Sequence, residues 1–184
     1  MVDISHLELP RLNGWGFLPS TEEVYNAFRE ISCTIPVDKI LEIGFNAGHS
    51  TTYLLEIFSQ ATVDSIGPSP KNNAPYVLKN KYKDRFNFHH GMTSEVAQYF
   101  DEDLENRNFD FALVDGHHKE RLVEFDVSYC RRLIIPNILA DNLELPQVKK
   151  VLDESDYSLI KTWDYECTWK NVTKVNQLGF YQLI

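Results

Sequence analysis

The chain has 184 residues, of which 43% are hydrophobic and 12% aromatic, a composition typical of folded globular proteins and unlike that of disordered ones. Acidic residues outnumber basic ones 27 to 18, and the resulting net charge of −9 argues against a nucleic acid partner. No run approaches the roughly 20 apolar residues of a membrane-spanning helix, and the first residues lack a secretion-signal pattern, so we expect a cytoplasmic protein without a membrane partner.

A chain of this length predicts a single domain over residues 1–184, in which residues 1–35 form a cap segment and a helix before the first strand. The cysteines are odd in number and widely spaced, at Cys33, Cys130 and Cys167. Because no CxxC pair is present, we expect reduced, mostly buried thiols instead of a zinc site or a redox dithiol.

Helix and strand patterns alternate along most of the chain. Helical spacing predicts helices over residues 21–32, 51–60, 74–82, 93–100, 119–132 and 147–154. Apolar runs predict strands over residues 39–43, 61–66, 85–89, 109–114 and 133–140. The acidic stretch 101–105 is interpreted as a solvated connection, and two alternating strands, 157–165 and 174–184, are joined by residues 166–172. This order predicts an α/β fold, a doubly wound, Rossmann-like seven-stranded sheet with an antiparallel C-terminal edge.

A glycine-rich turn joins the first predicted strand to the next helix, in the stretch ILEIGFNAGHS that ends at Ser50. Gly44 and Gly48 allow a ligand to approach the backbone, and the N–H groups of the helix start suit an anion. Ser50 is placed to hydrogen-bond the same group. A dinucleotide-binding turn has the pattern G-x-G-x-x-G, but position 46 is an asparagine, so a pyrophosphate site is disfavoured. A purely structural glycine turn is the alternative.

Polar residues follow the fourth and fifth predicted strands, where ligands gather in a doubly wound sheet. Asp115 begins the stretch Asp-Gly-His-His after strand four, and Asp141 and Asn142 follow strand five. These three side chains could converge as hard oxygen ligands for Mg²⁺ or Ca²⁺. In the alternative interpretation Asp115 caps the next helix, and His117 and His118 are solvated loop residues.

The pattern E-x-G-x-x-x-G-x-S resembles the first motif of class I S-adenosylmethionine-dependent methyltransferases. The placement of an aspartate after strand four and of an Asp-Asn pair after strand five resembles that in the divalent-metal-dependent O-methyltransferases of the catechol and caffeoyl-coenzyme A type. The pattern D-G-x-H, which begins at Asp115, resembles a group of small-molecule and sugar methyltransferases. The resemblance implies metal ligands at Asp115, Asp141 and Asn142, and cofactor contacts from Glu42, Gly44, Asn46, Gly48, Ser50, Gly67, Met92, Thr93 and Asp115.

The chain departs from the family pattern at three positions. A lysine three residues after the first aspartate is the usual base, but His118 stands there and becomes the candidate catalytic base. The acid that binds the cofactor ribose after strand two is replaced by Gly67, while Asp64 lies inside the predicted strand. Asn137 stands where the family has a glycine before strand five, and asparagine tolerates a left-handed conformation.

The resemblance implies an S-adenosylmethionine-dependent methyltransferase that methylates a hydroxyl group of a small molecule, either catechol-like or a sugar. A divalent cation, expected to be Mg²⁺, would assist the reaction. Two alternatives stay open, a metal-independent methyltransferase and a cofactor-binding or structural protein of the same fold without turnover. A homo-oligomer could complete the acceptor pocket, because few residues precede the first strand.

Overall fold

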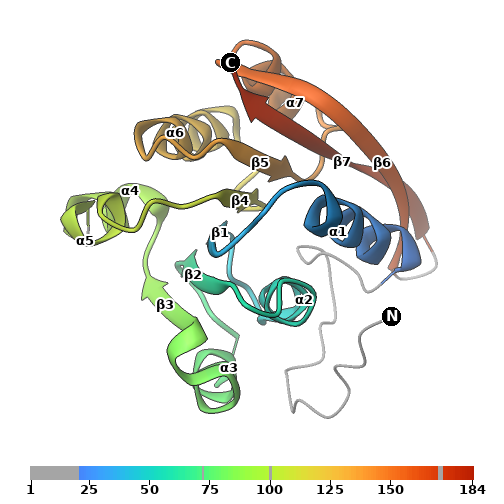
Figure 1. The fold of residues 1–184 in the computed structure, drawn as a ribbon. Coiled ribbons are helices and arrows are strands. Elements are labelled where there is room, and N and C mark those ends of the chain that lie inside the picture. Colours follow the sequence, from blue (N-terminus) through green and yellow to red (C-terminus); the bar gives the residue numbers. More distant parts are fainter. Residues whose placement is uncertain (1–20, 72, 100, 170–171) are drawn as a thin grey trace.

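The computed structural model describes residues 21–71, 73–99, 101–169 and 172–184, and these residues form a sheet with helices on both faces (Figure 1). The strands follow the order β3-β2-β1-β4-β5-β7-β6. Their bounds are Lys39–Ile43 (β1), Thr62–Gly67 (β2), Phe86–His90 (β3), Phe111–Val114 (β4), Asn137–Ala140 (β5), Tyr157–Trp169 (β6) and Val172–Leu183 (β7). The first five strands are parallel, and β7 is antiparallel to both of its neighbours. The predicted fold class is therefore confirmed.

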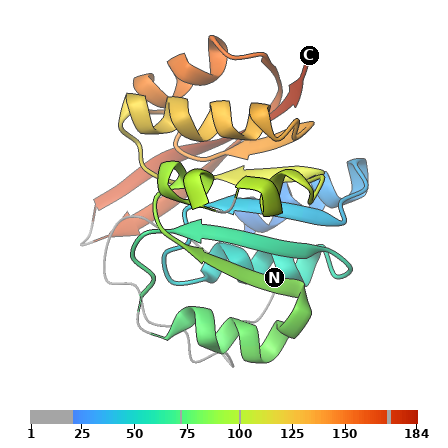
Figure 2. The same cartoon turned by 90° about the vertical axis from the view of Figure 1, so that its left-hand side faces the viewer.

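The helices divide between the two faces of the sheet, as the two views show (Figures 1 and 2). Their bounds are Glu22–Thr34 (α1), His49–Ile57 (α2), Ala74–Tyr82 (α3), Thr93–Tyr99 (α4), Asp101–Glu105 (α5), Glu120–Arg132 (α6) and Pro146–Asp153 (α7), with a short 3-10 helix at Lys83–Arg85. One apolar core contains buried residues of α1, α2 and α3, and a second contains residues of α4 to α7. Both faces of the central strands are thus covered, which explains their nearly continuous apolar sequence.

Two expectations about the chain's secondary structure are wrong. Residues 101–105 form α5 instead of a solvated connection, because Leu104 is fully buried and anchors this short acidic helix. Residues 166–172 are not a long connection either, since β6 continues to Trp169 and β7 begins at Val172. Backbone pairing between the two strands extends the hairpin beyond the residues whose alternating pattern suggested strands.

The turn before β5 also differs from the expectation. Asn137 is the first residue of β5, and its amide group donates a 3.0 Å hydrogen bond to the carbonyl oxygen of Asp110. The left-handed conformation occurs instead at Ile134, with φ of 54°, just after α6 ends. The strand is consequently shorter than the predicted 133–140, because residues 133–136 turn the chain back toward the sheet.

Two of the three cysteines are buried, as expected. Cys130 and Cys167 are buried and Cys33 is exposed, and all three are free. In the described parts of the chain, no helix is both long enough and apolar enough to cross a membrane. The N-terminal residues 1–20, which belong to the predicted cap segment, lie outside the described residues.

Candidate active site

Glu42 lies at the centre of a buried hydrogen-bond network below the turn that follows β1. Its side chain is fully buried, and its oxygens accept hydrogen bonds from Ser50 and Thr51, both at 2.5 Å, and from Ser65. Burial raises the pKa of Glu42, and the three hydroxyl donors oppose that shift. This network connects β1, α2 and β2 and fixes the turn between them. The hydroxyl group of Ser50, predicted to bind a ligand, donates to Glu42 in the structure.

Gly44 brings the ends of β1 and β4 into direct contact. Its φ is 119°, and a Cβ atom at this position would lie only 1.9 Å from the carbonyl oxygen of Asp115. The backbone N–H of Asp115 donates a 2.8 Å hydrogen bond to Ile43. Gly48, with φ of 80°, is the N-cap residue of α2 and would meet the side chain of Leu78 at 2.6 Å if it carried a Cβ. Gly44 is therefore required by both the conformation and the packing of this turn, and the positive φ of Gly48 also favours glycine.

A cavity of about 260 Å³ lies at the carboxyl ends of β1 to β4, where a ligand is expected in this fold. It is lined by Ile43, Gly44, Phe45, Asn46, Ile66, Pro68, Ser69, Lys71, Gly91, Met92, Thr93, Asp115, Gly116, His117, His118 and Asp126. The predicted site residues on its wall are Gly44, Asn46, Met92, Thr93, Asp115 and His118. The predicted residues that do not line it are Glu42, Gly48, Ser50, Gly67, Asp141 and Asn142.

Asp115 and Asp141 bring two carboxyl groups together at the edge of the cavity, within hydrogen-bonding reach of each other. The side chain of Asp115 is 9% exposed, and Asp141 is 4% exposed behind it. Burial and the neighbouring charge of Glu42 raise the pKa of Asp115 to about 8, and burial together with Asp115 raises the pKa of Asp141. In the described parts of the chain, no lysine or arginine forms an ion pair with either group.

The remaining contacts of Asp141 fix its orientation. Its Oδ1 atom accepts hydrogen bonds from the hydroxyl group of Tyr165 at 2.6 Å and from the backbone N–H of Asn142 at 2.7 Å. Asn142 has a φ of 60°, and its amide nitrogen donates to Glu144 at 3.2 Å. Among the described residues, no three His, Cys, Asp or Glu side chains gather as metal ligands. A cation bound here would therefore depend on two carboxylates and the amide oxygen of Asn142.

His118 lies on the cavity wall next to Asp115. Its Nε2 atom is 3.7 Å from Oδ1 of Asp115, which is too long for a hydrogen bond. That nitrogen is buried and has no hydrogen-bond partner among the described residues. The alternative in which Asp115 caps the next helix does not agree with the structure, because α6 begins at Glu120 with Lys119 as its N-cap residue.

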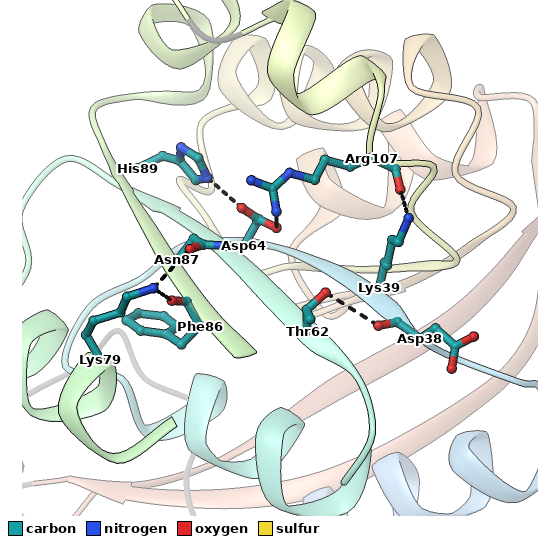
Figure 3. A network of polar contacts seen from close by, with 9 residues as sticks. All are labelled: Asp38, Lys39, Thr62, Asp64, Lys79, Phe86, Asn87, His89 and Arg107. Carbon is teal, nitrogen blue, oxygen red and sulfur yellow. Dashed lines mark hydrogen bonds and ion pairs between the residues drawn. The ribbon is translucent and has the colours of Figure 1, made fainter. Parts of the chain in front are cut away.

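The end of β2 carries no acid toward the cavity. A Cβ atom on Gly67 would lie 2.4 Å from the carbonyl oxygen of Phe45, so this glycine allows the two loops to pack closely. Asp64, in the middle of β2, is occupied in another network (Figure 3), where it lies 2.8 Å from His89 and accepts a 3.1 Å hydrogen bond from Arg107. The polar groups after β2 that do line the cavity belong to Ser69 and Lys71.

Two residues near the site were not singled out from the sequence. Tyr165 lies in β6, and no local pattern relates it to Asp141, which is 24 residues away. Asp126 lines the cavity from the middle of α6, between the buried residues Val123 and Val127. A charged residue on the apolar face of a helix is a signal that could have drawn attention to Asp126.

Residues 41–139, more than half of the chain, match a family model described as a methyltransferase domain. The chain belongs to the methyltransferase domain family. Its fold is that of the class I S-adenosylmethionine-dependent methyltransferases, as the sequence resemblance implied. The matched segment of this methyltransferase contains the β1 turn, Asp115 and Asp126 and ends before Asp141.

Solved methyltransferases share this fold at low sequence identity. Cofactor-bound Rv0187 from MTB is 18% identical with a TM-score of 0.67, and the match covers 95% of this chain and 84% of that one. The O-methyltransferase TomG from Streptomyces achromogenes, in complex with SAM, is 14% identical with a TM-score of 0.65. The match covers 90% of this chain and 82% of TomG. Precorrin-6y C5,15-methyltransferase from Geobacter metallireducens GS-15 is 12% identical with a TM-score of 0.66. The match covers 100% of this chain and 97% of that enzyme. No curated protein matches the sequence. These likenesses show the fold and do not select an acceptor.

Proposed function

We propose that this protein transfers the methyl group of S-adenosylmethionine to a hydroxyl group of a small molecule, catechol-like or a sugar, with the help of a divalent cation at Asp115 and Asp141. The observation that carries the proposal is the pair of carboxyl groups beside the cavity, with which no lysine or arginine in the described parts of the chain forms an ion pair. Two such groups repel each other when both are ionised, and a divalent cation would relieve that repulsion. When bound, such a cation would lower the pKa of an acceptor hydroxyl group.

The residues of the chain would supply the remaining parts of the reaction. The β1 turn, held by Gly44, would position the cofactor in the cavity, with its methyl group facing the end near Asp115. Nε2 of His118 is buried and has no hydrogen-bond partner within the described residues, and a neutral imidazole can accept the hydroxyl proton at this place. The acceptor oxygen would form its new bond to the methyl carbon while the bond from that carbon to sulfur breaks. The products would be a methyl ether, S-adenosylhomocysteine and a proton on His118.

The test is transfer of a labelled methyl group from S-adenosylmethionine to a panel of catechols and sugars with a vicinal diol. We expect methyl ether formation that increases with added Mg²⁺ or Mn²⁺ and falls at least tenfold in excess chelator. Transfer that is unchanged by the chelator would overturn the role of the cation. Binding of S-adenosylhomocysteine by calorimetry without transfer to any hydroxyl compound of the panel would count against O-methylation.

A matched pair of histidine variants tests the proposed base. His118→Gln should lower the rate of transfer at least a hundredfold while S-adenosylhomocysteine still binds. His90→Gln is the control, because His90 ends β3 and does not line the cavity. Equal rates for the two variants would remove His118 from the mechanism.

A further inference from the structure

Asp126 places a carboxyl group in the cavity wall from the middle of α6. The residue is only 5% exposed, and it projects from the helix toward the segments that follow β3 and β4. The side chain of Thr93, the first residue of α4, forms a hydrogen bond with it. The neighbouring helical residues Val123 and Val127 are buried in the apolar core of this face. Asp126 is thus a charged residue on a helix face that otherwise packs against apolar side chains.

The carboxyl group of Asp126 lies close to Gly116, the residue that follows Asp115. A Cβ atom on Gly116 would lie 2.7 Å from Oδ2 of Asp126, so any larger residue would displace the carboxyl group. Gly116 itself lines the cavity. Because Gly116 has no side chain, the carboxyl group of Asp126 can pass beside its backbone and line the cavity.

The known contacts of Asp126 do not use its full capacity as an acceptor. Burial raises its pKa to about 7, and the hydrogen bond from Thr93 opposes that shift only in part. In the described parts of the chain, no lysine or arginine forms an ion pair with it. An ionised carboxyl group accepts several hydrogen bonds and donates none, and burying one with a single donor costs free energy. A ligand that brings a further N–H donor would offset this cost.

The surroundings of Asp126 suit the planar base of the cofactor. Met92, which precedes Thr93, and Gly116, which faces the carboxyl group of Asp126, both line the cavity and offer it an apolar side chain and a stretch of backbone. The cavity is also lined by Gly44 and Asn46 of the β1 turn, which would hold the amino acid part of the cofactor. A base between Met92 and Gly116 would present its edge toward α6.

We propose that Asp126 recognises the adenine of the cofactor by accepting a hydrogen bond from its exocyclic amino group. This inference rests on the proposed use of S-adenosylmethionine. A carboxylate accepts from an amino group and repels a carbonyl oxygen at the same position, so Asp126 would determine specificity for the base. It would not take part in the chemical step.

The experiment compares the binding of S-adenosylhomocysteine with that of S-inosylhomocysteine, in which the amino group is replaced by an oxo group. Calorimetric titrations are performed at about pH 8.5, where the carboxyl group is ionised. Wild-type protein should prefer the adenosyl ligand at least tenfold. In Asp126→Asn the ratio of the two affinities should fall at least tenfold, because an amide can donate to the oxo group as well as accept from the amine.

Asp64→Asn is the matched control, since it makes the same change at a buried acid that does not line the cavity, and its affinity ratio should equal that of the wild type. A ratio that Asp126→Asn leaves unchanged would overturn the inference, even if both affinities fall because the fold is weakened. Wild-type binding of S-adenosylhomocysteine without discrimination would overturn it as well. If the wild type binds neither ligand, the proposed cofactor is wrong and this inference fails with it.

A second measurement does not depend on the folding of a variant. In a crystal structure of the wild type with S-adenosylhomocysteine, the exocyclic nitrogen should lie within about 3.2 Å of a carboxyl oxygen of Asp126. An adenine whose amino group faces another part of the cavity would exclude the proposed contact.

Discussion

The hydroxyl group of Tyr165 donates a 2.6 Å hydrogen bond to Asp141, and this contact joins the C-terminal hairpin to the two carboxyl groups beside the cavity. Asn176, in the other strand of the hairpin, donates to the same hydroxyl group at 3.2 Å. The antiparallel edge of the sheet therefore supports the site, although none of the hairpin residues that the structure describes lines the cavity. Asp141 has one oxygen occupied by these donors, and Asp115 approaches its carboxyl group.

Tyr165→Phe should reduce the free energy of unfolding by about 1–3 kcal/mol, the usual cost of removing a donor from a buried charged or partly charged acceptor. The loss should appear in chemical denaturation at neutral pH. Tyr157→Phe is the matched control, because the hydroxyl group of Tyr157 donates to the neutral carbonyl oxygen of Ile135 at 2.8 Å. We expect a smaller loss there, about 0.5–1.5 kcal/mol. The same stability for Tyr165→Phe and the wild type would show that this contact contributes little.

The raised pKa of Asp115 predicts a pH-dependent stability of the ligand-free protein. An aspartate carboxyl group ordinarily has a pKa of 3.8, whereas that of Asp115 titrates at about 8 in the folded protein, so the folded state holds a proton that the unfolded state releases. The contribution of Asp115 to the free energy of unfolding is therefore greatest below the ordinary pKa of 3.8. It is lost as the pH rises toward 8, by at most about 1.4 kcal/mol for each pH unit. Asp141 and Asp126 shift in the same direction.

Asp115→Asn should remove the part of this dependence that belongs to Asp115. Thermal unfolding without divalent cations should show the variant gaining stability over the wild type between about pH 5 and pH 8. Added Mg²⁺ should stabilise the wild type at the higher pH and leave the variant unaffected. A constant difference between the two proteins across this pH range would show that Asp115 is not protonated in the folded state.

Gly44→Ala should disrupt the contact between the ends of β1 and β4. The added methyl group would collide with the carbonyl oxygen of Asp115, and the backbone φ of 119° is unfavourable for alanine. We expect a loss of about 2 kcal/mol or more in stability, together with loss of measurable heat on titration with S-adenosylhomocysteine. Gly91→Ala should cost less, since its nearest contact is the flexible side chain of Glu95 at 3.2 Å.

Ile134→Gly should stabilise the protein. Ile134 follows the end of α6 with φ of 54°, and its side chain is 74% exposed, so it gains little from burial. Relieving the left-handed strain should raise the free energy of unfolding by about 1 kcal/mol. Ile134→Ala keeps the Cβ atom and should give little or none of this gain. Equal stability of both variants in urea denaturation would contradict the explanation.

Much of the fold could be predicted from the sequence because it depends on local periodicity. The strand Lys39–Ile43 and the helix Ala74–Tyr82 have the predicted bounds, since apolar spacing and turn residues determine both. The short helix α5 could not be predicted in this way, because its stability comes from the burial of Leu104 against residues distant in sequence. The long hairpin depends likewise on pairing between its strands.

The sequence by itself determined which chemical groups stand at the carboxyl ends of the strands, because the glycine turn and the stretches after β4 and β5 are local features. Only the tertiary structure decided how these groups are used. It joins Glu42 to Ser50 instead of leaving them open to the cavity, and it places Asp141 behind Asp115. It also brings Tyr165 and Asp126 to the site from elements distant along the chain. The reason is that burial and hydrogen bonding between distant segments form only when the sheet assembles.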